Sequence, residues 1–145
     1  MKKFVIFMAI VVLIVCGVSY AYLTYRANDQ EAKRENRAFE TYENQVVTGT
    51  ELSSVINRAM DSNSKNEIEK QKDGTYLSNT TNSIKVEVKM LDNGKTYTME
   101  SLVSQGLDQF IQYYYNVSFK CTKIDYHQTT KKVSYLLFEQ MTTNF

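Results

Sequence analysis

The side chains best suited to covalent or metal chemistry are scarce in this chain. His127 is the only histidine, and Cys121 is the only cysteine outside the apolar amino-terminal stretch. A cysteine nucleophile needs a histidine within hydrogen-bond contact, whereas residues six apart on one extended strand are separated by about 20 Å. One Cys and one His also fall short of a zinc tetrahedron. We therefore expect a core cysteine, a half-exposed histidine at a strand end, no metal or cofactor, and a protein that is not an enzyme.

Three consecutive tyrosines, Tyr113 to Tyr115, are the most unusual local feature. Tyrosine rings make good contact surfaces for sugars, peptides or bases. On a helix, consecutive side chains point about 100° apart, so the three rings cannot share one face. Tyr114 fits the apolar helical face that Leu107 and Phe110 begin, which predicts that it lies in the core. Tyr113 and Tyr115 remain as a candidate contact surface.

The overall charge argues against a nucleic-acid partner. The chain of 145 residues carries 17 Lys and Arg against 16 Asp and Glu, a formal net charge of +1. A protein whose affinity depends on neutralising many phosphates is strongly basic. The length offers room for one small folded domain.

The apolar residues gather at the amino terminus. Phe4 to Tyr25 is an uncharged run of 22 residues, which as a helix spans about 33 Å, enough for the hydrocarbon core of a bilayer. Tyr20, Tyr22 and Tyr25 lie where an interfacial belt of aromatic residues is expected. Residues 1–25 are therefore predicted to be a basic leader followed by a transmembrane anchor.

The same segment has a second interpretation. Lys2 and Lys3 followed by an apolar stretch and by Ser19-Tyr20-Ala21 is also typical of a signal peptide, and cleavage after Ala21 would release a secreted protein. If the anchor is retained, the lysine pair directly before it favours an amino terminus inside the cell. The domain would then lie outside the cytoplasmic membrane.

Self-association through the membrane helix is a further expectation. Gly17 and Ala21 are four residues apart, a small-residue spacing that lets two membrane helices approach closely. After the anchor, residues 26–44 contain no Gly or Pro and are rich in helix formers, which predicts a polar helical stalk. Only its last two turns carry an apolar stripe able to pack on a domain.

Residues 45–145 are predicted to form a small domain with two short helices. Thr48 to Glu51 fits a capping box, and the apolar periodicity after it predicts a helix that ends near Asp61. A second helix is expected after a break at Gly106.

The rest of the domain is predicted to form two hairpins. Residues 83–90 alternate as a half-buried strand, and Asp92-Asn93-Gly94 is a hairpin turn leading to a return strand over 95–99. Residues 117–126 and 133–139 predict the second hairpin, with a bulge near Thr122-Lys123. The expected fold class is therefore α+β, with about four antiparallel strands in two hairpins and two short helices.

This layout resembles that of type IV pilins and pseudopilins, in which a short basic leader and an apolar helix run into an amphipathic helix and a small antiparallel sheet. Prepilins have a Gly before the processing site, where this chain has Lys3, and a Glu five residues into the apolar segment, where it has Met8. The resemblance implies a pilin-like accessory subunit, and it assigns no functional residue.

The leading hypothesis is a non-enzymatic, single-pass membrane protein that presents its domain as a subunit of an envelope or surface assembly. Its expected partners are the lipid bilayer and other proteins, or a second copy through the amino-terminal helix. The alternative is a membrane-tethered ligand-binding or sensory module that uses its exposed tyrosines. A hydrolase whose carboxylates cannot be paired from the sequence is a third hypothesis.

Overall fold

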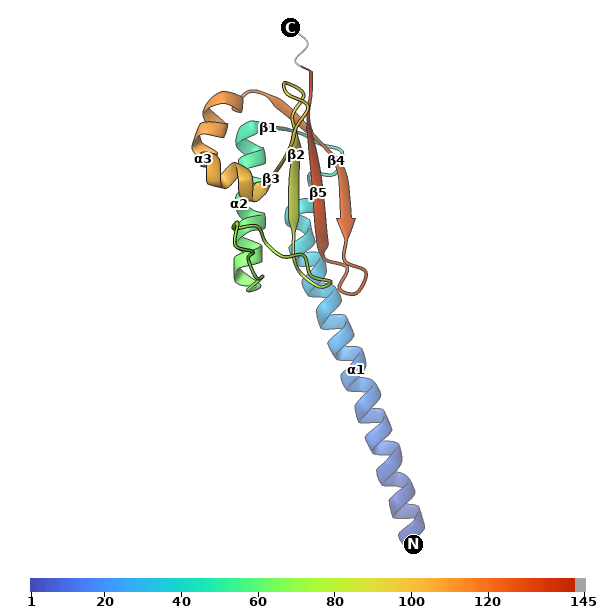
Figure 1. The fold of residues 1–145 in the computed structure, drawn as a ribbon. Helices are drawn as coiled ribbons and strands as arrows, with labels where there is room; N and C mark the ends of the chain where they lie inside the picture. Colours follow the sequence, from blue (N-terminus) through green and yellow to red (C-terminus); the bar gives the residue numbers. More distant parts are fainter. Residues whose placement is uncertain (143–145) are drawn as a thin grey trace.

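The structure, a computed structural model, describes residues 1–142. Within them the chain forms three helices and five strands: α1 (Lys2–Glu40), β1 (Val46–Thr48), α2 (Gly49–Lys65), β2 (Lys85–Lys89), β3 (Thr96–Thr98), α3 (Met99–Tyr114), β4 (Ser118–Tyr126) and β5 (Val133–Gln140). Figure 1 shows the domain gathered at one end of α1, with the amino terminus at the far end of the helix. The 39 residues of α1 make a rod about 58 Å long.

The two parts of α1 have different surroundings. Every residue from Phe4 to Tyr25 is exposed, whereas Ala32, Asn36 and Phe39 are buried on the face that meets the domain. The predicted helical stalk is confirmed up to Glu40, and its buried stripe begins at Ala32, earlier than the last two turns. The helix is therefore bare over its first half and docked over its last turns.

The strands form one mixed sheet in the order β1-β4-β5-β2-β3. The α+β class and the two antiparallel hairpins, β2 with β3 and β4 with β5, are confirmed. The prediction of about four antiparallel strands is wrong within residues 1–142, because β1 adds a fifth strand against β4 and β2 runs parallel to β5. Alternation predicts which face of a strand is buried and leaves open which strand edges will pair.

The buried face of the sheet packs against α2 and α3. The alternating residues of the first predicted strand all face the core, and the register of β4 against β5 shifts between Cys121 and Lys123, which confirms the predicted bulge. Cys121 is 1% exposed, as predicted for a core cysteine, and burial raises the pKa of its thiol to about 11. The core rests on packing between this sheet and the helices.

Helix α2 begins as predicted and ends later. The Thr48 hydroxyl accepts from the Glu51 amide, and the Glu51 carboxylate accepts from the Thr48 amide at 2.7 Å, so the capping box is confirmed. The predicted end near Asp61 is wrong, since the helix continues to Lys65. Asn63, which lies beyond the predicted end, is fully buried and bonds both backbone groups of Ile84 at 2.8 Å.

Helix α3 has a kink at the predicted position. Gly106 has φ 98° and ψ 100°, a conformation that side chains other than glycine rarely adopt. The residues before it are also helical, starting at Met99 after the Thr98 cap, so the predicted return strand is shorter than expected. The kink changes the direction of α3 at Gly106.

Candidate functional site

Asn36 fixes α1 to the domain. It is 6% exposed; its Nδ2 donates to the backbone oxygen of Lys131, and its Oδ1 accepts from the backbone amide of Val133, both at 2.8 Å. One side chain thus satisfies two backbone groups at the start of β5, as a neighbouring strand would. These paired bonds fix the rotation of α1 about its own axis as well as its position.

Lys132 adds an ion pair at the same junction. Its ammonium lies 3.0 Å from Glu35 and 3.3 Å from Glu31, which are one turn apart on α1, and its side chain is only 15% exposed. Burial alone would lower the pKa of Lys132, but the hydrogen bonds and charges of Glu35 and Glu31 outweigh burial and raise it. We call Asn36, Lys132 and these two glutamates the junction.

The turn between β4 and β5 is held rigidly behind the junction. His127 is 7% exposed, and its Nε2 donates to the backbone oxygen of Ser83 at 2.8 Å. The prediction of a half-exposed histidine is therefore wrong. The ring is buried, and its hydrogen bond joins the β4–β5 turn to the loop before β2. The Thr130 hydroxyl donates to the Thr81 carbonyl, so the turn is tied to the loop before β2 as well as to α1.

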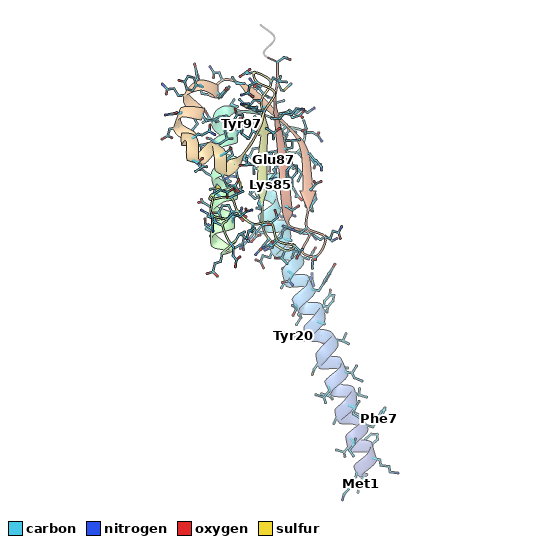
Figure 2. The ribbon with its side chains drawn as sticks, viewed as in Figure 1. Met1, Phe7, Tyr20, Lys85, Glu87 and Tyr97 are labelled. Carbon is cyan, nitrogen blue, oxygen red and sulfur yellow. The ribbon has the colours of Figure 1, made fainter. Side chains whose placement is uncertain are left out.

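A cleft of about 290 Å³ separates the amino-terminal side of the junction from this turn. It is lined by side chains of α1 and of the β4–β5 turn, namely Tyr25, Asn28, Asp29, Glu31, Thr129, Thr130, Lys131 and Lys132. Of the three tyrosines predicted at the membrane interface, Tyr25 lines this cleft. Tyr20 and Tyr22 stand out from the bare part of α1 at 75% and 58% exposed, as the Tyr20 side chain in Figure 2 illustrates.

Gly17 and Ala21 also lie on the bare part of α1. Both are exposed, and nothing lies within 4 Å of the position that a Cβ on Gly17 would take. This face of the helix is open to another helix or to lipid.

A second pocket, of about 220 Å³, opens at the opposite end of the domain. It lies between α3 and the β2–β3 hairpin, and its lining includes three tyrosines and three amide side chains: Tyr97, Tyr113, Tyr114, Asn93, Gln105 and Gln109. Tyr97 comes from β3, in the upper part of the domain in Figure 2. We call this cavity the tyrosine pocket.

The predicted tyrosine surface divides between pocket and core. Tyr113 is 76% exposed and lines the tyrosine pocket, whereas Tyr115 is 56% exposed and is not among the lining residues. Tyr114 packs on the core with its ring 5.0 Å from that of Phe110 and 6.3 Å from that of Phe119. Burial, followed by the charge of Asp92, raises the pKa of Tyr114.

Sequence reasoning missed Asn36, Lys132 and Tyr97. Asn36 had a detectable signal, since it lies four residues after Ala32 and three before Phe39, on the stripe that meets the domain. Lys132 and Tyr97 had none, because their partners come from distant parts of the chain.

Within residues 1–142, no three His, Cys, Asp or Glu side chains are placed to hold a metal ion together. One helix, α1, is long and apolar enough to cross a membrane. Comparison with known protein families, curated proteins and solved structures finds no match for this chain.

Proposed function

We propose that this protein is a non-enzymatic, single-pass membrane-anchored subunit that presents its small domain outside the cytoplasmic membrane. Its amino-terminal helix is apolar enough to span a bilayer, and the 18-residue window that meets this criterion has none of its surface buried by the domain. A bare apolar surface of this size needs lipid or other helices to cover it. The bilayer and neighbouring membrane helices are thus the proposed partners.

The observation that carries this proposal is the continuity of α1. One uninterrupted helix runs from Lys2 to Glu40, and Asn36 and Lys132 clamp its last turns to the domain. A flexible linker would let a tethered module explore many orientations. A clamped helix fixes the orientation of the domain relative to the anchor, which is what a subunit needs when its neighbours in an assembly must contact a defined face.

A pilin-like accessory role is the form of assembly that we propose. Resemblance to pilins supports it through the overall layout, in which a short basic leader and an apolar helix run into a helix that docks on a small domain with a sheet. The absence of the Gly and Glu signature residues, with Lys3 and Met8 in their places, favours an accessory subunit over a processed filament subunit. Gly17 and Ala21 would let the bare helices of two subunits approach closely.

The first test is the fate of the amino terminus in membranes. The full chain should stay in the membrane fraction after carbonate extraction, and its intact mass should correspond to the chain with residues 1–25 retained. A mass lacking residues 1–21 would overturn the anchor and make the domain a secreted one. Loss of residues 1–3 alone would favour the filament form of the pilin hypothesis.

The second test is association. A Gly17→Cys variant that also carries Cys16→Ala should form a disulfide-linked dimer in membranes under mild oxidation. The matched control is Val18→Cys in the same background, which points about 100° away on the helix. Equal cross-linking at both positions, or none at either, would contradict a specific helix interface.

A ligand-binding or sensory module is the second candidate, favoured by the tyrosine pocket. Its lining combines phenol rings with amide groups, which suit a neutral polar ligand such as a sugar or a peptide. We would titrate the full chain with soluble cell-wall oligosaccharides and short peptides. Binding that Tyr113→Ala abolishes and Tyr115→Ala leaves intact would support this function, and no binding by either class would count against it.

A further inference from the structure

We infer that the cleft between α1 and the β4–β5 turn binds the phosphate of a phospholipid headgroup, with Lys131 as its main contact. The inference rests on the proposed membrane anchor. It adds a site at which the domain itself touches the membrane surface, in addition to the helix that crosses it.

The position of the cleft is the first argument. Tyr25, the last residue of the uncharged run, lines it, and so do Asn28 and Glu31 further along α1. Along a helix, Asn28 lies about 4.5 Å and Glu31 about 9 Å beyond Tyr25. The headgroup layer extends about 5 to 7 Å beyond the hydrocarbon core on each side. With the uncharged run in the bilayer, the mouth of the cleft lies at the height of the headgroups.

The arrangement of the domain gives the second argument. In Figure 1 the β4–β5 turn is the part of the sheet that lies nearest to the bare half of α1. The junction and the bonds of His127 and Thr130 hold this turn in place against α1 and the loop before β2. An anchored chain therefore carries a rigid turn to the lipid surface.

The charges in the cleft give the third argument. Its two carboxylates already have cations: Asp29 pairs with Lys33 at 2.7 Å, and Glu31 pairs with Lys132 at 3.3 Å. Lys131 is exposed and, within residues 1–142, forms no ion pair. The Lys131 ammonium, the Thr129 hydroxyl and the Asn28 amide belong to the same lining and are groups that can donate hydrogen bonds to the oxygens of a phosphodiester. The cleft therefore suits an anionic group that enters from the membrane side.

The test places one fluorescent label beside the cleft of the full chain. A Gln128→Cys variant carries an environment-sensitive dye, with Cys16 replaced by Ala, because Gln128 is exposed in the same turn and does not line the cleft. Cys121 can stay, because it is 1% exposed and burial raises the pKa of its thiol to about 11. The labelled chain is placed in nanodiscs of phosphatidylcholine, or of phosphatidylcholine with phosphatidylglycerol, each containing a lipid with a nitroxide on its headgroup. A label at residue 113, at the opposite end of the domain, is the positional control.

We expect the headgroup nitroxide to quench the label at 128 and to leave the label at 113 bright. Anionic lipid should increase the quenching at 128. Lys131→Gln should reduce that increase about fivefold, because one lysine near an anionic surface contributes about this factor to binding. Lys95→Gln, the same charge change in the exposed β2–β3 turn at the opposite end of the domain, should have no effect.

Three results would overturn the inference, and they can be told apart. Equal quenching at 128 and 113 in a chain that resists carbonate extraction would refute the headgroup site and leave the anchor standing. Loss of the chain on carbonate extraction would refute the anchor and the site together. A change in the label at 128 when inorganic phosphate is added to detergent-solubilised protein, as large as the change in nanodiscs, would assign the cleft to a free anion.

Discussion

The two ends of the domain differ in their main contacts. At the end that holds α1, buried polar side chains bond to backbone groups of distant segments, as Asn36 does to Val133 and Asn63 does to Ile84. At the opposite end, Gln140 makes one such bond to the Leu91 amide, and the rings of Phe110, Tyr114 and Phe119 pack together with centroids 5.0 to 6.3 Å apart. Hydrogen bonds are directional and fix one geometry, whereas aromatic contacts tolerate shifts. The first end is suited to hold an orientation, and the second leaves room for an open pocket.

The largest effect is expected at the aromatic end. Phe119 is fully buried between Phe110 and Tyr114, so Phe119→Ala should lower the free energy of unfolding by about 4 kcal/mol through lost burial and the cavity left behind. Urea unfolding of the full chain in detergent, followed by near-ultraviolet circular dichroism, measures it. Tyr115→Ala, an exposed ring on the same segment, is the control. A loss below about 1 kcal/mol in Phe119→Ala would mean that the ring cluster is not part of the stable core.

The end that holds α1 should respond almost as strongly to loss of a single amide. Asn36→Leu removes two hydrogen bonds and leaves the buried Val133 amide and Lys131 carbonyl without partners. The expected cost is about 3 kcal/mol of unfolding free energy. Asn28→Leu makes the same change at an exposed position of α1 and should cost much less. If both variants were equally stable, the docking of α1 would not depend on the Asn36 amide.

Features with local causes could be predicted from the sequence. The capping box at Thr48, the alternation in 83–90, the Asp92-Asn93-Gly94 turn and the break at Gly106 each depend on residues a few positions apart. Their conformations follow from nearby hydrogen bonds, from burial on one face, or from the backbone freedom of glycine. These elements formed as expected.

Features with distant partners could not be predicted. Strand β1 has three residues and exists through its pairing with β4, and β2 lies beside β5 although the hairpins gave no sign of which edges would meet. The sequence predicts Asn63 beyond the end of its helix and His127 half-exposed at a strand end, because polar side chains are usually exposed. They are buried since each satisfies backbone groups of the segment before β2.

The sequence predicts part of each candidate site and misses the rest. Tyr113 and Tyr115 are exposed, as helical geometry suggested, and their role in binding stays a prediction. Tyr97, which completes the tyrosine pocket, and the β4–β5 turn, which forms one wall of the cleft beside Tyr25, come from strands and turns far away in the chain. No spacing in the sequence connects them to their partners.

The ion pairs of the junction predict a pH dependence confined to the end of the domain that holds α1. The pKa of Lys132 in the folded protein is raised above its ordinary 10.5, so its stabilising contribution is fully present below pH 10.5 and is lost as the pH rises through the folded value. Lys132→Met, which keeps an apolar side chain of similar length, should cost about 1 kcal/mol at pH 8. The difference from the parent chain should disappear in strong alkali.

Unfolding curves of the parent and of Lys132→Met between pH 8 and pH 12 give that difference, and comparing the two chains cancels the ionisation of the tyrosines. Lys33→Met is the matched control, since its pair with Asp29 lies within α1 and is exposed. A difference that stayed constant up to the highest pH would show that Lys132 acts through its methylene stem and that its charge contributes nothing to the junction.

The smallest effect on stability is expected at Tyr113, which lies on the exposed rim of the aromatic end, beside the packed ring of Tyr114. Tyr113 is 76% exposed, so Tyr113→Ala should change the free energy of unfolding by less than about 0.5 kcal/mol. Its neighbour Tyr114 packs on Phe110 and Phe119, and Tyr114→Ala should cost about 3 kcal/mol, measured in the same urea titrations. Two adjacent tyrosines with such different costs would leave Tyr113 free to serve a ligand, because nothing in the fold depends on its ring. Equal costs would instead make Tyr113 a structural residue and remove the main support for binding at the tyrosine pocket.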